Sequence, residues 1–206
     1  MRNNTSILQS FLTALGLVTL SLCLTDCANQ AKPDGEMAKE QMVDRGQYLV
    51  TIASCNDCHS PKIMTPQGPI LDSTRLMSGH RAGSMLPKLD TSMVNPNGWI
   101  SMSPEITAFV GPWGISYAAN LTPDETSGIG AWTEDTFIKT LRTGKHLGQV
   151  GGRQILPPMP WFFINKMTDE DLKSVFAYLK SLPPINNQVP APVPPNELNS
   201  VNVTGK

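Results

Sequence analysis

The 206-residue sequence has little of what defines several common protein classes. Of its four cysteines, Cys23 and Cys27 lie near the start, which leaves too few for a structural zinc site of four cysteine ligands. Its 16 Lys and Arg against 17 Asp and Glu give a net charge of −1, so bulk charge does not favour nucleic acid or an anionic membrane surface as a partner. The length fits one domain with appendages.

The first 27 residues are predicted to be an export signal. Arg2 precedes an apolar run over residues 7–24 that polar residues interrupt, which is typical of a secretion signal; an uncleaved anchor is the alternative. Residues 24–27 resemble a bacterial lipoprotein processing site, which would lipidate Cys27 and tether the protein to a membrane. Asp26 departs from the small residue usual there, so a discarded or passive Cys27 stays open. We expect a periplasmic protein with residues 28–36 as the tether.

The most informative motif is Cys55-Asn56-Asp57-Cys58-His59. Cysteines three positions apart can each form a thioether to one haem, and the histidine that follows can bind the iron. The C-x-x-C-H pattern therefore predicts one covalently bound haem c, held by Cys55 and Cys58, with His59 as an iron ligand.

Cys55 and Cys58 have two other interpretations. A thiol-disulfide centre uses C-x-x-C at the start of a helix between parallel strands. Here the apolar and small residues of the segment 36–54 recur at helical spacing, so the cysteines would close a helix, and no parallel-strand pattern surrounds them. A zinc site lacks its remaining ligands. Within the predicted helix, Gly46 indicates close approach of another helix, and a tolerated surface glycine is the alternative.

Helices are also predicted after three threonines, each followed by acidic residues. Thr122 opens a capping-box turn that Gly128 ends, Thr133 opens a helix up to Gly144, and Thr168 opens a helix that ends before Pro183. Between them and the motif, residues 61–117 carry seven prolines and no sustained period, so loops and short strands are expected, partly extended over residues 100–110. Residues 186–206 are predicted to be an extended tail, draped on the domain or free.

A helix that leads into C-x-x-C-H, a loop-rich middle and an amphipathic last helix resemble the class I cytochrome c fold. The segments 120–124, 128–133, 156–161 and 168–172 are similar to periplasmic c-type cytochromes that serve membrane-associated dehydrogenases as subunits. The resemblance implies a mainly α class I cytochrome c-like domain over residues 37–185, with a long loop-rich insertion after the haem motif. Many such subunits carry two or three haem motifs, and this sequence has one.

The resemblance also implies the function. The chain is expected to carry single electrons in a respiratory chain or as a dehydrogenase subunit, with a dehydrogenase or oxidase as redox partner, and to catalyse no reaction itself. The alternative is a haem enzyme or gas sensor with an open sixth iron position. A docking module within a larger dehydrogenase assembly is a third interpretation.

Met159 is predicted to be the second iron ligand, opposite His59. Prolines at 157, 158 and 160 fix the backbone around it, which suits a weak thioether ligand, and the class I resemblance implies a methionine in the same strap. A core-filling role is the alternative, and Met102 is the next candidate among ten methionines.

Other residues can contact the cofactor. His80 and His146 stand in glycine-flanked loops, where a hydrogen-bonding role is more common than iron ligation. Four tryptophans can pack on the porphyrin or donate to a propionate, with ordinary core packing as the default: Trp99, Trp113, Trp132 and Trp161. Tyr117, Arg142 and Arg153 can bind a propionate, with a solvated surface position as the default.

Overall fold

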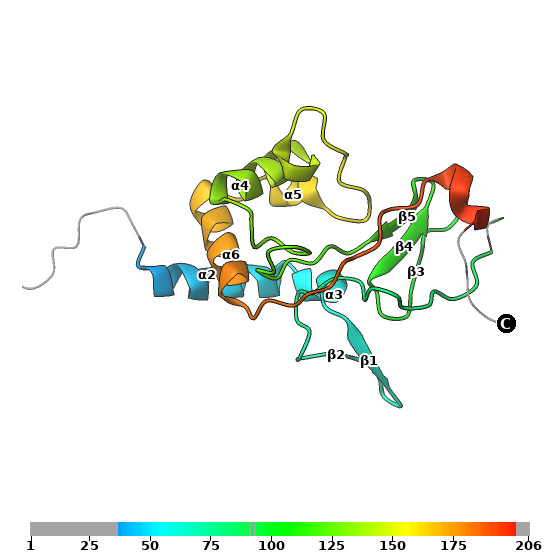
Figure 1. Cartoon of the computed structure of the whole chain (residues 1–206), viewed down its shortest axis with the longest axis horizontal. Helices are drawn as coiled ribbons and strands as arrows, with labels where there is room; N and C mark the ends of the chain where they lie inside the picture. The colour runs from blue at the N-terminus through cyan, green and yellow to red at the C-terminus, as the bar shows by residue number, and fades with distance from the viewer. Residues whose placement is uncertain (1–36, 91, 93, 201–206) are drawn as a thin grey trace, which may run out of the picture. The chain divides into compact units, whose positions relative to one another are not determined.

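The computed structural model of the chain describes residues 37–90, 92 and 94–200. The predicted export signal, Cys27 and the tether lie outside these residues, as does the end of the predicted tail. The described residues form five α-helices and two small antiparallel sheets (Figure 1), in agreement with a mainly α class. The helices are α2 (Lys39–Ile52), α3 (Cys55–His59), α4 (Glu134–Thr143), α5 (Trp161–Ile164) and α6 (Asp169–Ser181).

Helices α2 and α6 pack against each other, and Gly46 makes the contact close. A Cβ atom at Gly46 would lie 2.0 Å from the backbone oxygen of Ser174, so no other residue fits without moving α6. Arg45 forms an ion pair with Asp171 at 3.0 Å beside this contact. The prediction that Gly46 permits close approach of a second helix is confirmed.

Two of the three predicted helix starts are confirmed. The Thr133 and Thr168 hydroxyls accept from the backbone N–H groups of Thr136 and Asp171, so they cap α4 and α6 as expected. Gly144 ends α4 with φ of 65°, a conformation that glycine adopts without strain.

The third predicted start, at Thr122, is wrong. Residues 122–130 form turns, because the Thr122 hydroxyl bonds to Asn120 and Ile185 and does not cap a helix. Asp124 organises the turn, since its carboxylate accepts from the backbone and hydroxyl groups of Thr126 and Ser127. These hydrogen bonds lower the pKa of Asp124 to about 2.

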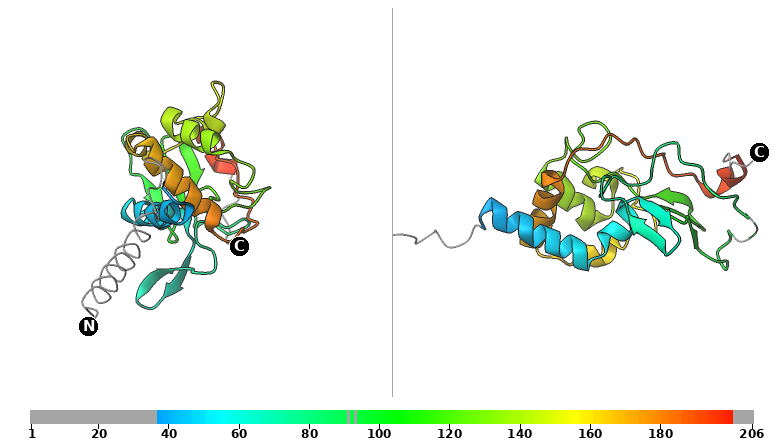
Figure 2. Two further views of the ribbon diagram at one scale, coloured as in Figure 1. Left: turned by 90° about the vertical axis from the view of Figure 1, so that its left-hand side faces the viewer. Right: turned by 90° about the horizontal axis from the view of Figure 1, so that it is seen from below.

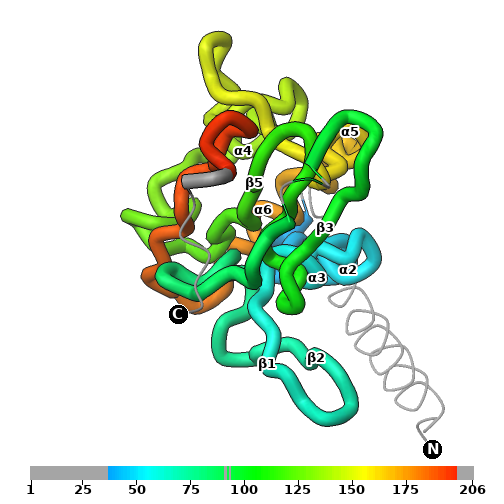
Figure 3. The backbone as a smooth tube through the Cα atoms, turned by 90° about the vertical axis from the view of Figure 1, so that its right-hand side faces the viewer, coloured from blue at the N-terminus to red at the C-terminus, as the bar shows by residue number. Residues whose placement is uncertain are grey.

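The segment after the haem motif contains both sheets. Strands β1 (Lys62–Thr65) and β2 (Gly68–Leu71) form a hairpin that extends away from the neighbouring elements (Figure 3). Strands β3 (Ser101–Met102), β4 (Ala108–Gly111) and β5 (Gly114–Tyr117) form the second sheet in the order β3-β4-β5. The inward side chains of β4 and β5 are buried, so this segment has a small core of its own.

The chain after α6 lies along the domain up to the 3-10 helix η3 (Pro195–Ser200), as Figure 2 shows. Asn187 is buried and binds the backbone of Ser78, His80 and Ala82. Val193 then pairs with Ile115 of β5. Of the two interpretations left open for this segment, the draped one is correct up to residue 198, where Leu198 is buried.

The main core lies between α2, α4 and α6. It contains seven buried side chains, Val50, Met77, Ile129, Phe137, Leu141, Leu172 and Leu179. Among residues 37–200 no helix combines the length and the apolar character required to cross a membrane.

Candidate functional site

The C-x-x-C-H motif forms its own short helix, α3, and does not close α2. Helix α2 ends at Ile52, and Ser54 adopts a left-handed conformation with φ of 54° before Cys55 opens α3. The expectation that the cysteines close the preceding helix is therefore wrong. The reason is local, because a left-handed residue turns the chain and a new helix starts in another direction.

His59 is held in the tautomer that an iron ligand requires. Its Nδ1–H donates to the backbone oxygen of Ala119 at 2.8 Å, and since a carbonyl only accepts, Nδ1 must carry the hydrogen. Burial lowers the pKa of His59, which favours the neutral ring. Among the described residues none bonds to Nε2, so that nitrogen keeps a free lone pair, as a metal-bound imidazole needs.

The two cysteine thiols are unsuited to thiol-disulfide chemistry. Burial raises the pKa of Cys55 to about 11 and also raises that of Cys58, whereas reactive thiols have lowered values. Although Cys55 does begin a helix, the described strands pair only in antiparallel fashion, so the strand-helix-strand setting is missing. Thiols that become thioethers need no stable thiolate in the folded protein, so these pKa values agree with haem attachment.

The zinc interpretation also lacks support. In the part of the chain that the structure describes, no three or more His, Cys, Asp or Glu side chains are grouped so that they could hold a metal ion. The donor set at α3 is two cysteines and one histidine with a free Nε2, which fits haem c.

Met159 packs against the same core cluster as Cys55. Both side chains are partly buried there, although about 100 residues separate them in the sequence. The strap that carries Met159 is fixed from β5, because the Ser116 hydroxyl donates to the backbone oxygen of Pro157 at 2.5 Å. The indole N–H of Trp113 donates to the Ser116 oxygen at 3.2 Å.

One segment therefore holds both predicted ligand-bearing parts of the chain. Ser116 binds the strap of Met159, and three residues later the backbone oxygen of Ala119 orients His59. Neither contact has a sequence signal, because both use a backbone oxygen as acceptor and both join residues more than 40 positions apart.

The other methionines are placed less favourably. Met102 is 61% exposed on β3 and lies outside the core cluster that Cys55 and Met159 pack against. Met77 is fully buried in the cluster, which sequence reasoning missed. Its backbone N–H donates to the Ser60 hydroxyl, and Gly79 binds the backbone oxygen of His59, so Met77 belongs to the segment packed beside His59.

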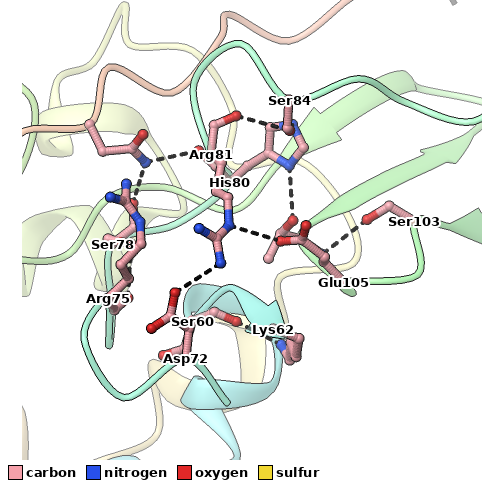
Figure 4. Close-up of polar contacts among 12 residues, drawn as sticks. Ser60, Lys62, Asp72, Arg75, Ser78, His80, Arg81, Ser84, Ser103 and Glu105 are labelled. Atoms are coloured by element: carbon pink, nitrogen blue, oxygen red, sulfur yellow. Dashed lines mark hydrogen bonds and ion pairs between the residues drawn. The ribbon is translucent and has the colours of Figure 1, made fainter. Parts of the chain in front are cut away.

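His80 has the hydrogen-bonding role that was its default interpretation. Its Nδ1 lies 2.9 Å from the Thr107 hydroxyl and its Nε2 lies 3.0 Å from the Ser84 hydroxyl (Figure 4). It also packs on the Tyr117 ring, with 4.8 Å between the ring centroids. Both ring nitrogens are thus occupied. His146 lies in the 3-10 helix η2 (His146–Gly148) and contacts the Trp132 ring edge-on.

The remaining candidates divide between packing and surface positions. Arg142 binds the backbone of Asn165 and the carboxylate of Asp169, so it links α4 to the start of α6. Arg153 is exposed and donates to Gln154. Trp132 packs against the main core, whereas Trp99 is 76% exposed.

The neutral state of His80 predicts a pH dependence of stability. Burial lowers the pKa of His80 below its usual value of about 6.5, and Glu105 partly opposes this. As the pH falls below about 6.5, the unfolded chain takes up the proton first, so the free energy of unfolding decreases until the pH reaches the folded-state pKa. We expect the decrease to be smaller in His80→Gln, by at most about 1.4 kcal/mol per pH unit, the limit for one proton. Urea unfolding at several pH values measures this, and equal slopes in both proteins would contradict it.

These features together resemble a c-type cytochrome, and the comparisons with known proteins give the same class. No protein-family profile matches the chain. Over an alignment of 167 residues it is 29% identical to the fructose dehydrogenase cytochrome subunit of Gluconobacter japonicus. This alignment covers 81% of this chain and 26% of that protein. Over 143 residues, which make up 69% of this chain and 24% of the relative, it is 29% identical to the gluconate 2-dehydrogenase cytochrome c subunit of Pantoea cypripedii.

A third relative is the cytochrome c subunit of the quinone-dependent alcohol dehydrogenase of Gluconobacter oxydans. The chain is 26% identical to it over 156 residues, or 75% of this chain and 24% of that protein. The chain thus spans about a quarter of the length of these relatives. The predicted resemblance to cytochrome c subunits of dehydrogenases is confirmed.

Proposed function

We propose that the protein carries single electrons through one haem c, attached covalently to Cys55 and Cys58 and ligated by His59 and Met159. The observation that carries the proposal is the fixed tautomer of His59, whose Nε2 lone pair is free on the helix that bears both cysteines. When bound, the haem supplies a one-electron couple. The chain's residues orient the histidine through Ala119, hold the Met159 strap through Ser116 and surround the site with apolar side chains.

The proposed domain is of the class I cytochrome c type, with residues 61–119 as its loop-rich insertion. Crossing of the first and last helices supports this, since α2 and α6 pack through Gly46. Residues 37–185 form the domain in this proposal. Residues 1–27 act as an export signal and residues 28–36 as a tether to the membrane if Cys27 is lipidated, while residues 186–206 complete the chain as its tail.

The partner in this proposal is a dehydrogenase, from which the chain accepts electrons in the periplasm. The names of the relatives support this, because several are cytochrome subunits of dehydrogenases. The respiratory chain is the proposed destination of the electrons. The protein is then a subunit or carrier and not the catalyst.

The test is the addition of carbon monoxide to the reduced protein. With both axial positions filled by His59 and Met159, the spectrum should change slowly or not at all. Rapid binding would instead support the alternative, a haem enzyme or gas sensor with an open sixth position.

Ser116 is expected to stabilise the Met159 ligation. Its hydroxyl is the side-chain contact that joins β5 to the strap at Pro157, so Ser116→Ala frees that backbone oxygen and loosens the strap. We expect the sulfur-to-iron charge-transfer band of the oxidised protein to disappear at a lower temperature than in the unmodified protein. Loss of one hydrogen bond corresponds to about 1 kcal/mol. The exposed Ser92→Ala is the control, and an unchanged transition in Ser116→Ala would refute the role.

A further inference from the structure

Lys62 is a buried lysine directly after the haem motif, and it binds the end of helix α3. Its exposed fraction is 7%, and its ammonium group donates to the backbone oxygens of Ser60 at 2.8 Å and Asn56 at 3.4 Å, and to that of Asp57. The Asn56 and Asp57 oxygens belong to the helix that carries Cys58 and His59, and Ser60, drawn with Lys62 in Figure 4, is the residue that follows it. Lys62 therefore caps the short motif helix from inside the protein.

The three contacts require the charged form of Lys62. Hydrogen bonds to three backbone oxygens require three N–H donors, which an ammonium group has and a neutral amine does not. Burial opposes the charge and lowers the pKa of Lys62. The helix end compensates, because its unpaired carbonyl groups carry partial negative charge. Within the described residues no carboxylate forms an ion pair with the ammonium.

Two carboxylates favour the charged form of Lys62, that of Asp57 more strongly and that of Glu105 less. The Glu105 carboxylate lies outside the motif helix. It forms an ion pair with Arg81 at 3.4 Å, and Arg81 also binds Asp72 at 2.9 Å. The Glu105 charge favours the charged form of Lys62. The motif helix therefore ends at a positive charge, and the ion pair of Arg81 with Glu105 lies in the same region (Figure 4).

We propose that Lys62 is a positioning residue that raises the reduction potential of the haem by placing a fixed positive charge at the end of the helix that holds His59. This rests on the proposed function. A cation near the iron disfavours the oxidised form, which carries one more positive charge than the reduced form, and burial weakens the screening of that interaction. Glu105 acts in the opposite direction and more weakly, because it is partly exposed.

The experiment measures reduction potentials by spectroelectrochemical titration of the full chain and three variants. Lys62→Met keeps the length of the side chain and removes the charge, so we expect the equilibrium to shift about tenfold toward the oxidised form, which is about 59 mV for one electron. Glu105→Gln should shift it severalfold toward the reduced form. Lys39→Met is the matched control, because Lys39 is exposed at the first residue of α2, and no shift is expected.

The outcomes separate this inference from the proposed function. If the unmodified protein holds no covalent haem, the proposed function fails before any potential is compared. If Lys62→Met keeps its haem and its potential equals that of the unmodified protein, the inference is wrong. If Lys62→Met does not fold, Lys62→Gln is measured in its place: a potential below that of the unmodified protein supports the inference, and an equal or higher one overturns it.

Discussion

Replacement of both Cys55 and Cys58 by alanine is expected to abolish haem attachment completely. The two thiols are the only covalent anchors in the motif, and an iron ligand alone does not retain haem through denaturation. The unmodified protein should keep its haem through acid-acetone extraction and denaturing electrophoresis, and the double variant should show none on a haem-stained gel.

The single variants sharpen this test. If both thioethers form, Cys55→Ala and Cys58→Ala should each keep at most one of them. Neither single variant should therefore match the haem attachment of the unmodified protein. Haem that is extractable from the unmodified protein would contradict covalent attachment. Haem that remains on the double variant would show that other residues hold it.

Replacement of Met159 by alanine is expected to open the iron to carbon monoxide. Without the thioether the sixth position is vacant or filled by water, so the reduced variant should bind carbon monoxide rapidly and the oxidised variant should lose its sulfur-to-iron charge-transfer band. Met159→His should keep carbon monoxide out and lower the reduction potential, because methionine opposite histidine raises it relative to two histidines. Both measurements use absorption spectroscopy of the same samples.

Two matched variants control for the loss of any methionine. Met102→Ala removes an exposed thioether and should change neither property. Met77→Leu keeps the volume of a side chain buried in the core and should also keep the charge-transfer band. If Met159→Ala retains the band and Met77→Leu loses it, Met77 is the ligand and the assignment of Met159 is wrong.

Local signals predicted much of the fold. The Thr133 and Thr168 caps and the glycine stop at residue 144 depend on residues within one turn of each other. The missing side chain of Gly46 predicted a helix contact, although its partner Ser174 lies on α6. The same local reasoning was wrong at Thr122 and at the junction between α2 and α3. At Thr122 the structure depends on hydrogen bonds of the hydroxyl to Asn120 and Ile185. At the junction it depends on the left-handed backbone of Ser54. The residue types dictate neither.

The sequence predicts the residues that would bind the cofactor but not the groups that orient those residues. The spacing of Cys55, Cys58 and His59 indicates the cofactor, and the proline frame indicates Met159. The groups that orient them are a backbone oxygen at Ala119, a hydroxyl at Ser116 and the buried ammonium of Lys62. Backbone oxygens carry no sequence signal, and serine and lysine are usually surface residues, so only folding reveals these roles.

Covalent haem attachment and ligation are tested together by the absorption spectrum of the protein exported to a bacterial periplasm, recorded oxidised, reduced and after denaturation. We expect one haem per chain that stays with the polypeptide when it unfolds, a low-spin spectrum in both oxidation states and a sulfur-to-iron band in the oxidised protein. A chain without haem, haem released on denaturation, or a high-spin spectrum from an open iron position would contradict it.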